Sequence, residues 1–366
     1  MNILLMSKIF VHSGVASHIM DLAKNLIDRG HTVWIMSSNN LNTEFCEQNN
    51  LTYVKMDFSM HPTHLIRNVF AIRGFIKKNS IEIVHCHHRT CALYMKVINT
   101  IVRVPFVWTN HLNNIPSGFI HRKTTFYGQQ AICVSSDLKD FCINKLKIPA
   151  SKISVVYNGI NTERYKYDEV YVSEFRRKWN IGSKKVIGLF ARMDPIKGHS
   201  HLINAISNIP RVKLQNCVIV FYGNLTMGGV NSYVESLKQL INSKGLSEHF
   251  IFEGFVSPEQ ALSLSDLSVL PSLEEGFAIV SIESFLMKKL HIRTKTAGYR
   301  DMRDCCIGVE IGDDVQLQRA IEEWLDGKNY TELINHAYQV VFQRFTIDKM
   351  VDRVFNIYQD AINYRI

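Results

Sequence analysis

The sequence predicts an α/β protein made of two parallel-sheet domains in tandem. Short runs rich in valine and isoleucine alternate with longer segments of helical period, which is typical of parallel strands joined by crossover helices. A polar, charge-rich interval at 161–184 interrupts the alternation, which then restarts. The length of 366 residues also favours two domains, since a domain usually has roughly 100 to 200 residues. Two Rossmann-like units are therefore the simplest interpretation.

The first half of the chain predicts a sheet that starts with its first residues. Buried strands are expected at 2–6, 32–37, 51–56, 82–86, 105–109, 131–135 and 153–157. A helix is expected over 15–28, and Gly30 can supply its left-handed C-terminal cap. A second helix, over 62–78, carries much of the basic surface of this half. These elements define an N-terminal domain over 1–164.

The second half repeats the alternation. Strands are expected at 185–190, 218–222, 250–253 and 266–270. Helices are expected to begin near Gly198, Val230, Pro258 and Phe277. The pattern is helical from Val315 onward, and Thr346 can cap a last helix. We therefore expect a second domain over 165–345, and a C-terminal helix over 346–366 that packs back on the N-terminal domain.

The composition excludes several classes of protein. Hydrophobic residues make up 46% of the chain and charged residues 20%, which argues against a disordered or fibrous protein. No run approaches the roughly 18 apolar residues that a membrane-spanning helix needs, and the first residues do not resemble a signal peptide. The eight cysteines form no CxxC pair, so buried free thiols in a reducing cytoplasm are expected, without a disulfide at 305–306.

The net charge of +9 is unevenly placed. Between residues 61 and 130 the only acidic residue is Glu82, whereas basic residues occur at 67, 73, 77, 78, 89, 96, 103, 122 and 123. Apolar residues lie among these cations, namely Leu65, Val69, Phe70, Phe75, Phe119, Phe126 and Tyr127. Such interleaving suits an anionic membrane face, or an acceptor carried there, although the same apolar residues can pack a helix on its sheet.

The most informative segment is 271–283, which follows a predicted buried strand. It turns through Glu275 and Gly276 and is expected to open a helix whose first amides form an anion site, those of Phe277, Ala278 and Ile279. The spacing of Glu275 and Glu283 corresponds to up to roughly 12 Å along a helix, which is long for an acid/base pair. One carboxylate at each end of an extended anionic ligand fits better, and a nucleotide diphosphate sugar has that layout.

A second segment, 188–198, presents Arg192 and Lys197 where a strand ends. The next helix is expected to begin at Gly198. A guanidinium fork and a mobile ammonium group together suit a diphosphate. Open α/β sheets bind their ligands at this end of the strands. The plain alternative is that both cations are solvated, that Glu275 only caps a helix, and that Glu283 faces solvent.

Two further groups of residues lie in the first half. Gly14 precedes the first helix and would permit close approach of the backbone to a ligand, but the loop lacks the GxGxxG fingerprint of a dinucleotide enzyme. Histidines gather at 85, 87 and 88, and again at His111, at or just past strand ends. No HExxH or comparable spacing is present, so we expect no metal site, and we expect His85 to belong to the core.

Taken together, these segments resemble the retaining GT-B glycosyltransferases of family four. The similar positions run over almost the whole chain: Ser13 and Gly14, 29–33, 155–161, 191–192, 197–198, 252–256 and 271–283. The resemblance implies two Rossmann-like domains whose sheets face each other across a cleft. Three positions depart from the family pattern: Ser13 replaces one glycine of a pair, Ala191 replaces a glycine, and the late Gly-Gly-x-x-Glu region reads differently at 297–301.

The resemblance also implies residue roles. Arg192 and Lys197 would hold the donor diphosphate and Glu283 the ribose hydroxyls. Glu275 would contact the transferred sugar together with the amides of Gly276, Phe277, Ala278 and Ile279. Val256 would lie near the base, Gly14 near the phosphates, and His111 beside the donor sugar. No protein nucleophile, metal or other cofactor is implied, since charge stabilisation of the leaving group is the main catalytic effect.

We therefore expect a retaining hexosyltransferase that moves a sugar from a nucleotide diphosphate sugar, with UDP first, to a glycan or lipid-linked acceptor. The expected setting is bacterial surface polysaccharide or glycoconjugate synthesis. We expect a cytoplasmic protein that can lie on the inner face of the plasma membrane. No nucleic-acid partner is expected. Two alternatives stay open: a GT-B-shaped nucleotide-sugar epimerase or phosphorylase, and a non-catalytic scaffold of a glycan-assembly complex. An epimerase would convert the donor without an acceptor, and the four charged residues argue against a scaffold.

Overall fold

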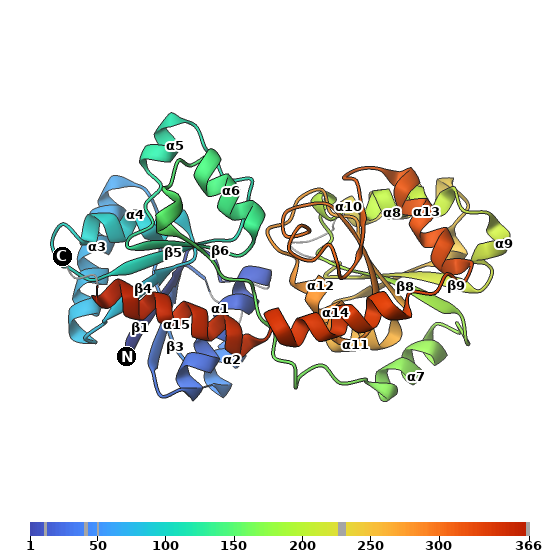
Figure 1. The fold of residues 1–366 in the computed structure, drawn as a ribbon, viewed down its shortest axis with the longest axis horizontal. Coiled ribbons are helices and arrows are strands. Elements are labelled where there is room, and N and C mark those ends of the chain that lie inside the picture. The colour runs from blue at the N-terminus through green and yellow to red at the C-terminus, as the bar shows by residue number, and fades with distance from the viewer. Residues whose placement is uncertain (11–12, 40–42, 50, 226–231, 364–366) are drawn as a thin grey trace. The chain divides into compact units, whose positions relative to one another are not determined.

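The protein consists of two α/β units, each built on one parallel sheet (Figure 1). The computed structural model describes residues 1–10, 13–39, 43–49, 51–225 and 232–363. Unit 1 comprises Met1–Ile160 and Phe345–Ile366, and unit 2 comprises Asn161–Arg344. The predicted fold class, α/β with two Rossmann-like units, is confirmed.

The sheet of unit 1 has seven strands in the order β3-β2-β1-β4-β5-β6-β7. The strands are β1 (Asn2–Ser7), β2 (Thr32–Ser37), β3 (Thr52–Lys55), β4 (Ile83–Cys86), β5 (Phe106–Asn110), β6 (Gln130–Cys133) and β7 (Ile153–Val155). Every neighbouring pair is parallel. The chain runs outward in one direction from β1 to β3 and then in the other from β4 onward. The strand order therefore reverses between β1 and β4, which is where sheets of this kind bind ligands.

Helices of unit 1 connect and cover these strands. They are α1 (Gly14–Asp28), α2 (Thr43–Gln48), α3 (Pro62–Lys78), α4 (Arg89–Ile98), α5 (Phe119–Lys123), α6 (Ser136–Asn144), η1 (Ala150–Lys152) and α15 (Ile347–Asn363). Gly30 has a φ of 84°, as its predicted role at the end of α1 requires. The final helix α15 belongs to this unit, because Val351, Val354 and Tyr358 are buried in the same apolar cluster as residues of α1.

The sheet of unit 2 has six strands in the order β10-β9-β8-β11-β12-β13. The strands are β8 (Lys185–Phe190), β9 (Cys217–Tyr222), β10 (Phe250–Gly254), β11 (Leu267–Leu270), β12 (Leu290–Thr294) and β13 (Ile307–Val309). The sequence analysis did not predict β12 and β13. Strand β12 contains His291 and Arg293, which are polar yet buried, so it is not an apolar run. Strand β13 has only three residues.

The helices of unit 2 are α7 (Glu169–Lys178), η2 (Pro195–Lys197), α8 (His199–Ser207), α9 (Arg211–Leu214), α10 (Ser232–Ser243), η3 (Ser247–His249), α11 (Pro258–Leu264), α12 (Ile279–Leu286), α13 (Asp314–Leu325) and α14 (Thr331–Arg344). The helix expected near Gly198 begins at His199, and the one expected at Pro258 begins there. Val230 lies outside the described residues, and α10 is described from Ser232. The helix expected at Phe277 begins two residues later, for a reason given below.

All eight cysteines are buried and free, so their predicted burial is confirmed. Among the described residues, no helix is both long and apolar enough to cross a membrane.

Candidate active site

Two loops that carry predicted site residues leave the sheet of unit 2 at neighbouring positions. Strands β8 and β11 pair in parallel, with Ile187 beside Leu267 and Gly188 beside Ser268. The strand order reverses between them, because β9 and β10 lie on one side of β8 and β12 and β13 on the other side of β11. The loops after β8 and β11 therefore open at the point where such a sheet binds ligands.

A close backbone contact joins the two loops. Gly198 has a φ of 73°, and a Cβ built there would lie 2.0 Å from the carbonyl oxygen of Pro271, so only glycine fits. The amide of Leu273 donates to the carbonyl oxygen of Ile196 at 2.8 Å. The side chain of Asp194 accepts from the amide of Ile196 and so caps η2. The loop that presents Lys197 is thus fixed against the loop that presents Glu275.

Lys197 and Glu275 form an ion pair across these loops. The Lys197 Nζ lies 2.7 Å from Glu275 Oε1, and only 17% and 10% of the two side chains are exposed. The hydroxyl of Ser272 donates to the same carboxylate oxygen at 2.7 Å. A largely buried carboxylate needs such partners, since an uncompensated buried charge is strongly unfavourable. The pair therefore fixes both charged groups before any ligand arrives.

Arg192 lies on the loop after β8 but is held far less tightly. Half of its side chain is exposed, and its Nη2 lies 3.7 Å from Asp194 Oδ2, beyond hydrogen-bonding distance. An exposed pair at this distance costs little to rearrange. Its guanidinium can therefore turn toward an anion that binds at the loop.

Glu283 lies in α12 and is 7% exposed, so the alternative in which it faces solvent is wrong, whereas its predicted role toward a ligand stays a prediction. The hydroxyl of Tyr165 donates to Glu283 Oε1 at 2.7 Å. Tyr165 precedes α7 and is more than 100 positions away along the chain. Tyr165 is not predicted from the sequence, because its neighbours in the sequence form no motif.

The helix start differs from the prediction. Ala278 has left-handed backbone angles, φ 66° and ψ 80°, which a right-handed helix cannot contain, so α12 begins at Ile279. Phe277 is buried and lies in the turn after Gly276. Of the three amides predicted at the helix start, those of Phe277 and Ala278 belong to this turn, and only that of Ile279 belongs to the helix.

Arg293 supports this turn from β12, and the sequence analysis missed it as well. Its side chain is fully buried, and Nη1 donates to the carbonyl oxygen of Phe277 at 3.2 Å. Nη2 donates to the carbonyl oxygen of Ala297 at 3.1 Å. Gly298 has a φ of 84° and packs closely on Phe277. A Cβ built on Gly298 would lie 2.9 Å from the Cα of Phe277. The region 297–301, which departs from the family pattern, thus has a role in fixing the turn before α12.

A buried polar group fixes α12 to the sheet. His291 Nε2 lies 3.0 Å from the hydroxyl of Ser281, and its Nδ1 lies 3.0 Å from the hydroxyl of Ser268. The hydroxyl of Ser284 also donates to that of Ser268 at 2.9 Å. Burial, and then the charge of Arg293, lower the pKa of His291 to about 3. The imidazole is therefore neutral at neutral pH and joins two hydroxyl groups.

We predict that His291 makes folding sensitive to acid. The unfolded chain takes up a proton near pH 6.5 and the folded chain only near pH 3, so stability is complete above 6.5 and is lost as pH falls. The loss from this group is about 2 kcal/mol at pH 5. Urea unfolding at pH 7.5 and pH 5 should show a smaller loss for His291→Gln than for the parent. The exposed His121→Gln serves as a control, and an equal loss in all three proteins would contradict the prediction.

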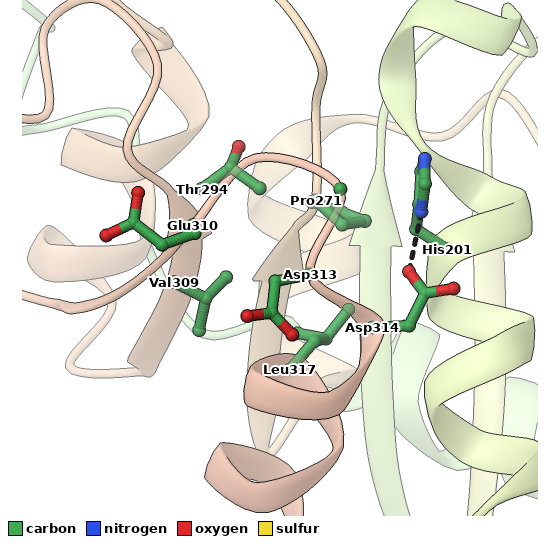
Figure 2. A pocket seen from close by; sticks show the side chains of 9 residues that line it. His201, Pro271, Thr294, Val309, Glu310, Asp313, Asp314 and Leu317 are labelled. Atoms are coloured by element: carbon green, nitrogen blue, oxygen red, sulfur yellow. Dashed lines mark hydrogen bonds and ion pairs between the residues drawn. The ribbon is translucent and has the colours of Figure 1, made fainter.

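The other predicted residues belong to other segments of the chain. Val256 follows β10 and precedes α11. It packs against the apolar cluster of unit 2 that includes Val220 and Ile251. Gly14 is the exposed first residue of α1 in unit 1. A pocket in unit 2 shares only Pro271 with the loops after β8 and β11 (Figure 2). It is lined by His201 and Asp314, which form a hydrogen bond 2.6 Å long. None of the predicted donor-binding residues lines this pocket, so we give it no role in donor binding.

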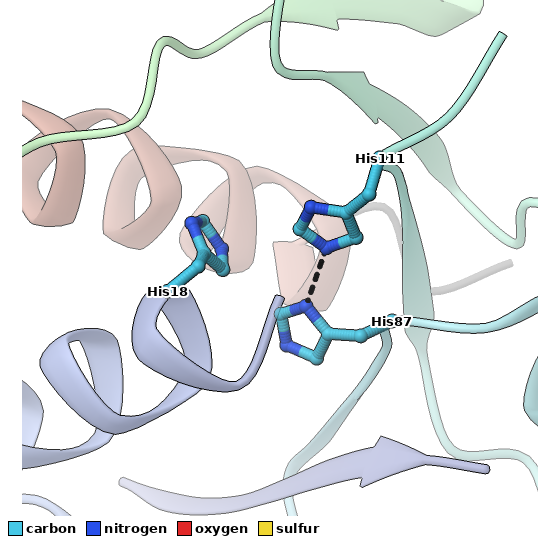
Figure 3. A group of neighbouring side chains, drawn as sticks. All are labelled: His18, His87 and His111. Carbon is cyan, nitrogen blue, oxygen red and sulfur yellow. Dashed lines mark hydrogen bonds between the residues drawn. The ribbon is translucent and has the colours of Figure 1, made fainter. Parts of the chain in front are cut away.

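His111 belongs to a group of histidines at the strand reversal of unit 1 (Figure 3). His87 follows β4, His111 follows β5, and His87 Nδ1 lies 3.2 Å from His111 Nε2. Burial lowers the pKa of His18 to about 4, and burial with neighbouring imidazoles holds the pKa values of His87 and His111 well below the usual range. His85 is buried between Tyr358 and Thr109, so its predicted place in the core is confirmed. The role of His111 beside a donor sugar stays a prediction.

Comparison with protein families identifies the class of this protein. The profile of Glycosyltransferase Family 4 matches residues 12–164, and that of Glycosyl transferases group 1 matches residues 172–340. The two matches together cover most of both units. The chain therefore belongs to family four of the GT-B glycosyltransferases, as the sequence predicts.

Individual relatives are distant but extend over most of the chain. An uncharacterised glycosyltransferase of Methanocaldococcus jannaschii is 24% identical over 95% of each chain. The processive diacylglycerol alpha-glucosyltransferase of Acholeplasma laidlawii is 25% identical over 80% of this chain and 83% of its own. The structure of Anabaena HepE in complex with UDP superposes with a TM-score of 0.87 at 20% identity, covering 98% of this chain and all of HepE. These likenesses support the fold and the family.

Proposed function

We propose that this glycosyltransferase moves a sugar from a nucleoside diphosphate sugar, with UDP as the first choice, to an acceptor hydroxyl with retention of the anomeric configuration. The observation that carries the proposal is the Lys197–Glu275 ion pair at the strand reversal of unit 2. It holds a cation and a carboxylate where a nucleotide diphosphate sugar needs both. HepE, which has a similar fold, has been crystallised with UDP and with UDP-glucose, and this supports the choice of donor.

Each charged residue binds a different part of the donor. Arg192 and Lys197 bind the diphosphate and stabilise the charge that develops as it leaves. Glu283, oriented by Tyr165, accepts hydrogen bonds from the ribose hydroxyls. Glu275 binds hydroxyl groups of the transferred sugar, with help from the amides of the turn at 276–279. The acceptor hydroxyl attacks the anomeric carbon on the face from which the diphosphate departs, and its proton passes to the departing phosphate oxygen. The configuration is therefore kept without a nucleophile from the protein.

A direct test combines donor screening with analysis of the product. Purified protein is screened against a panel of nucleotide sugars for thermal stabilisation, because a ligand that binds the folded state raises its melting temperature. The donor found is then incubated with lipid and glycan acceptors, and the anomeric configuration of the product is read by NMR. The proposal predicts transfer that depends on acceptor and keeps the configuration. Conversion of the donor without an acceptor would indicate an epimerase, and an inverted product would exclude retention.

We predict that the two carboxylates have separable effects. Glu283→Gln weakens binding of the free nucleoside diphosphate, because the ribose loses a charged acceptor, at a cost of about 1.5 to 3 kcal/mol. Glu275→Gln slows transfer but does not weaken binding of the nucleoside diphosphate, since Lys197 is released from its ion pair. Calorimetry on the free nucleotide and steady-state turnover separate the two effects. Equal losses of nucleotide affinity in both variants would contradict this division.

Glu323→Gln is a suitable control for these two variants. Glu323 also lies in unit 2, in α13, and pairs with the exposed Lys328 at 2.7 Å, outside the loops after β8 and β11. Its replacement should leave both nucleotide affinity and turnover close to the parent values. Tyr165→Phe should in turn reproduce part of the effect of Glu283→Gln, because it removes one hydrogen bond from the same carboxylate.

We further propose that the acceptor is presented at an anionic membrane surface, to which α5 of unit 1 binds. Phe119 and Ile120 of α5 are more than 70% exposed, and His121, Arg122 and Lys123 follow them. Arg89 donates to the carbonyl oxygens of Pro116 and His121 at 2.8 Å, which holds this segment in place. Apolar side chains beside cations suit the membrane interface. The Acholeplasma relative is named for a diacylglycerol acceptor, which supports this choice of acceptor.

Helix α3 contributes less to this surface than its sequence predicts. Val69 is buried, and Leu65 and Phe75 are half-buried, so they pack within unit 1. Ile66 and Phe70 are exposed beside Arg67. The apolar part of the proposed membrane-binding surface is therefore mainly α5, and a cytoplasmic protein bound peripherally through it is the localisation that we propose.

We predict that vesicle binding depends on both components of α5. Cosedimentation with vesicles rich in anionic lipid should fall at high salt, because cations near such a surface contribute about 1 kcal/mol each and are screened. It should also fall for Phe119→Ser with Ile120→Ser, and for Arg122→Gln with Lys123→Gln. Val212→Ser is the control, because Val212 is 69% exposed between Arg211 and Lys213 in unit 2. Binding that is absent at low salt, or equal in all these proteins, would contradict the proposal.

A further inference from the structure

A fully buried arginine lies directly behind the turn that precedes α12. Arg293 belongs to β12, and arginine is almost never fully buried in proteins. Its guanidinium donates to the carbonyl oxygens of Phe277 at 3.2 Å and Ala297 at 3.1 Å. It also donates to the hydroxyls of Ser281 at 3.4 Å and Thr296 at 3.1 Å. Because apolar side chains often replace buried charges without loss of stability, this charge needs an explanation other than packing.

The contact with Phe277 determines how the next amide points. No peptide bond among the described residues is cis, and the C=O and N–H of a trans peptide point in opposite directions. Since Arg293 holds the carbonyl oxygen of Phe277 on the buried side, the N–H of Ala278 points to the other side. Phe277 is buried, whereas Ala278 is half-buried. Arg293 therefore turns the amide of Ala278 toward the accessible side of the turn.

Ala278 also begins a concave row of amides. Its backbone is left-handed, with φ 66° and ψ 80°, and Ile279 begins the right-handed helix α12. Successive residues of opposite hand turn neighbouring N–H groups toward one point, which is an arrangement that binds anions. No described residue accepts a hydrogen bond from the amides of Ala278, Ile279 or Val280. These three amides are therefore available to an anion.

The left-handed conformation of Ala278 is held by its surroundings. A residue with a Cβ is strained there. Arg293 joins the carbonyl oxygens of Phe277 and Ala297, and Gly298 packs on Phe277 where a side chain would not fit. Strained backbone that its surroundings hold in place is typical of turns that bind ligands. The row of amides is therefore fixed before a ligand arrives.

We propose that Arg293 is a positioning residue of the donor site, which aims the amide of Ala278 at the donor diphosphate and places a positive charge behind that amide. This inference rests on the proposed function, and it leaves the amides of Gly276 and Phe277 to the transferred sugar. A buried charge acts through a low dielectric and is screened less than a surface charge. A neutral sugar hydroxyl gains little from such a charge, whereas a phosphate gains directly.

The test compares nucleosides with their diphosphates on the full chain. Calorimetry gives the affinities of uridine, guanosine, adenosine and cytidine and of their 5′-diphosphates, and the pair that the parent binds most tightly is used. Arg293→Gln should weaken binding of the diphosphate by roughly 10- to 100-fold, because the bond from an amide to a charged oxygen is lost. The nucleoside should bind as before. Arg293→Lys keeps the charge and should recover part of the loss.

Ser284→Ala is the matched control, because it removes buried hydrogen bonds from α12 without contacting the turn. The hydroxyl of Ser284 donates to that of Ser268 at 2.9 Å and to the carbonyl oxygen of Val280 at 2.7 Å. This variant should keep the parent's preference for the diphosphate. If Arg293→Gln weakens nucleoside and diphosphate equally, or if Ser284→Ala loses the same preference, Arg293 only maintains the fold and the proposal is overturned.

The same data separate this inference from the proposed function. A parent that binds the diphosphate no better than the nucleoside would contradict the proposed donor site, and the inference with it. A parent that prefers the diphosphate, beside an Arg293→Gln variant that keeps the whole preference, would overturn the inference alone.

A measurement on the parent keeps the proposal testable if Arg293→Gln does not fold. The full chain is labelled with ¹⁵N-alanine, and the amide signal of Ala278 is assigned from its loss in Ala278→Gly. The diphosphate should shift the amide proton of Ala278 downfield, as a hydrogen bond to phosphate does, whereas the nucleoside should not. A signal of Ala278 that stays in place at saturating diphosphate would overturn the proposal.

Discussion

The ion pair between Lys197 and Glu275 is the interaction on which the rest of the candidate donor site depends. It joins the loops after β8 and β11, and the contact of Gly198 with Pro271 brings those loops close enough for it to form. Because each charge compensates the other, the site keeps an ammonium group and a carboxylate largely out of solvent without a ligand. Under the proposed function, a donor diphosphate shares Lys197 with Glu275, whereas the exposed Arg192 can turn toward it at little cost. The ion pair fixes the positions of Lys197 and Glu275, and Arg192 completes the candidate donor site when it turns.

Much of the fold could be predicted from the sequence, because most strands are buried on both faces and appear as apolar runs. The exceptions have specific causes. Strand β12 contains His291 and Arg293, whose polarity is satisfied by partners far along the chain. The start of α12 depends on the left-handed backbone of Ala278. The sequence does not indicate this conformation, because residues other than glycine rarely adopt it. The charged candidate residues could be proposed from the sequence because they lie in contiguous motifs. The contacts of Tyr165 and Arg293 arise only in the folded chain.

The two units place different side chains at the same point of a shared topology. Both sheets begin with the same order, in which the first strand lies between the second and the fourth of its unit. At that reversal unit 2 presents a cation and carboxylates, and unit 1 presents His18, His87 and His111. The fold determines where side chains gather, and the side chains determine what is bound.

The measurement that tests the central claim most directly compares a nucleoside with its diphosphate. Calorimetric affinities are determined for both compounds, with the base of the donor found by screening, on the parent and on Arg192→Ala with Lys197→Ala. Each charge-assisted bond to phosphate is worth about 1.5 to 3 kcal/mol, so the parent should prefer the diphosphate by roughly 100-fold or more, and the double variant should lose most of that preference while binding the nucleoside as before. A double variant that keeps the full preference for the diphosphate would contradict the account.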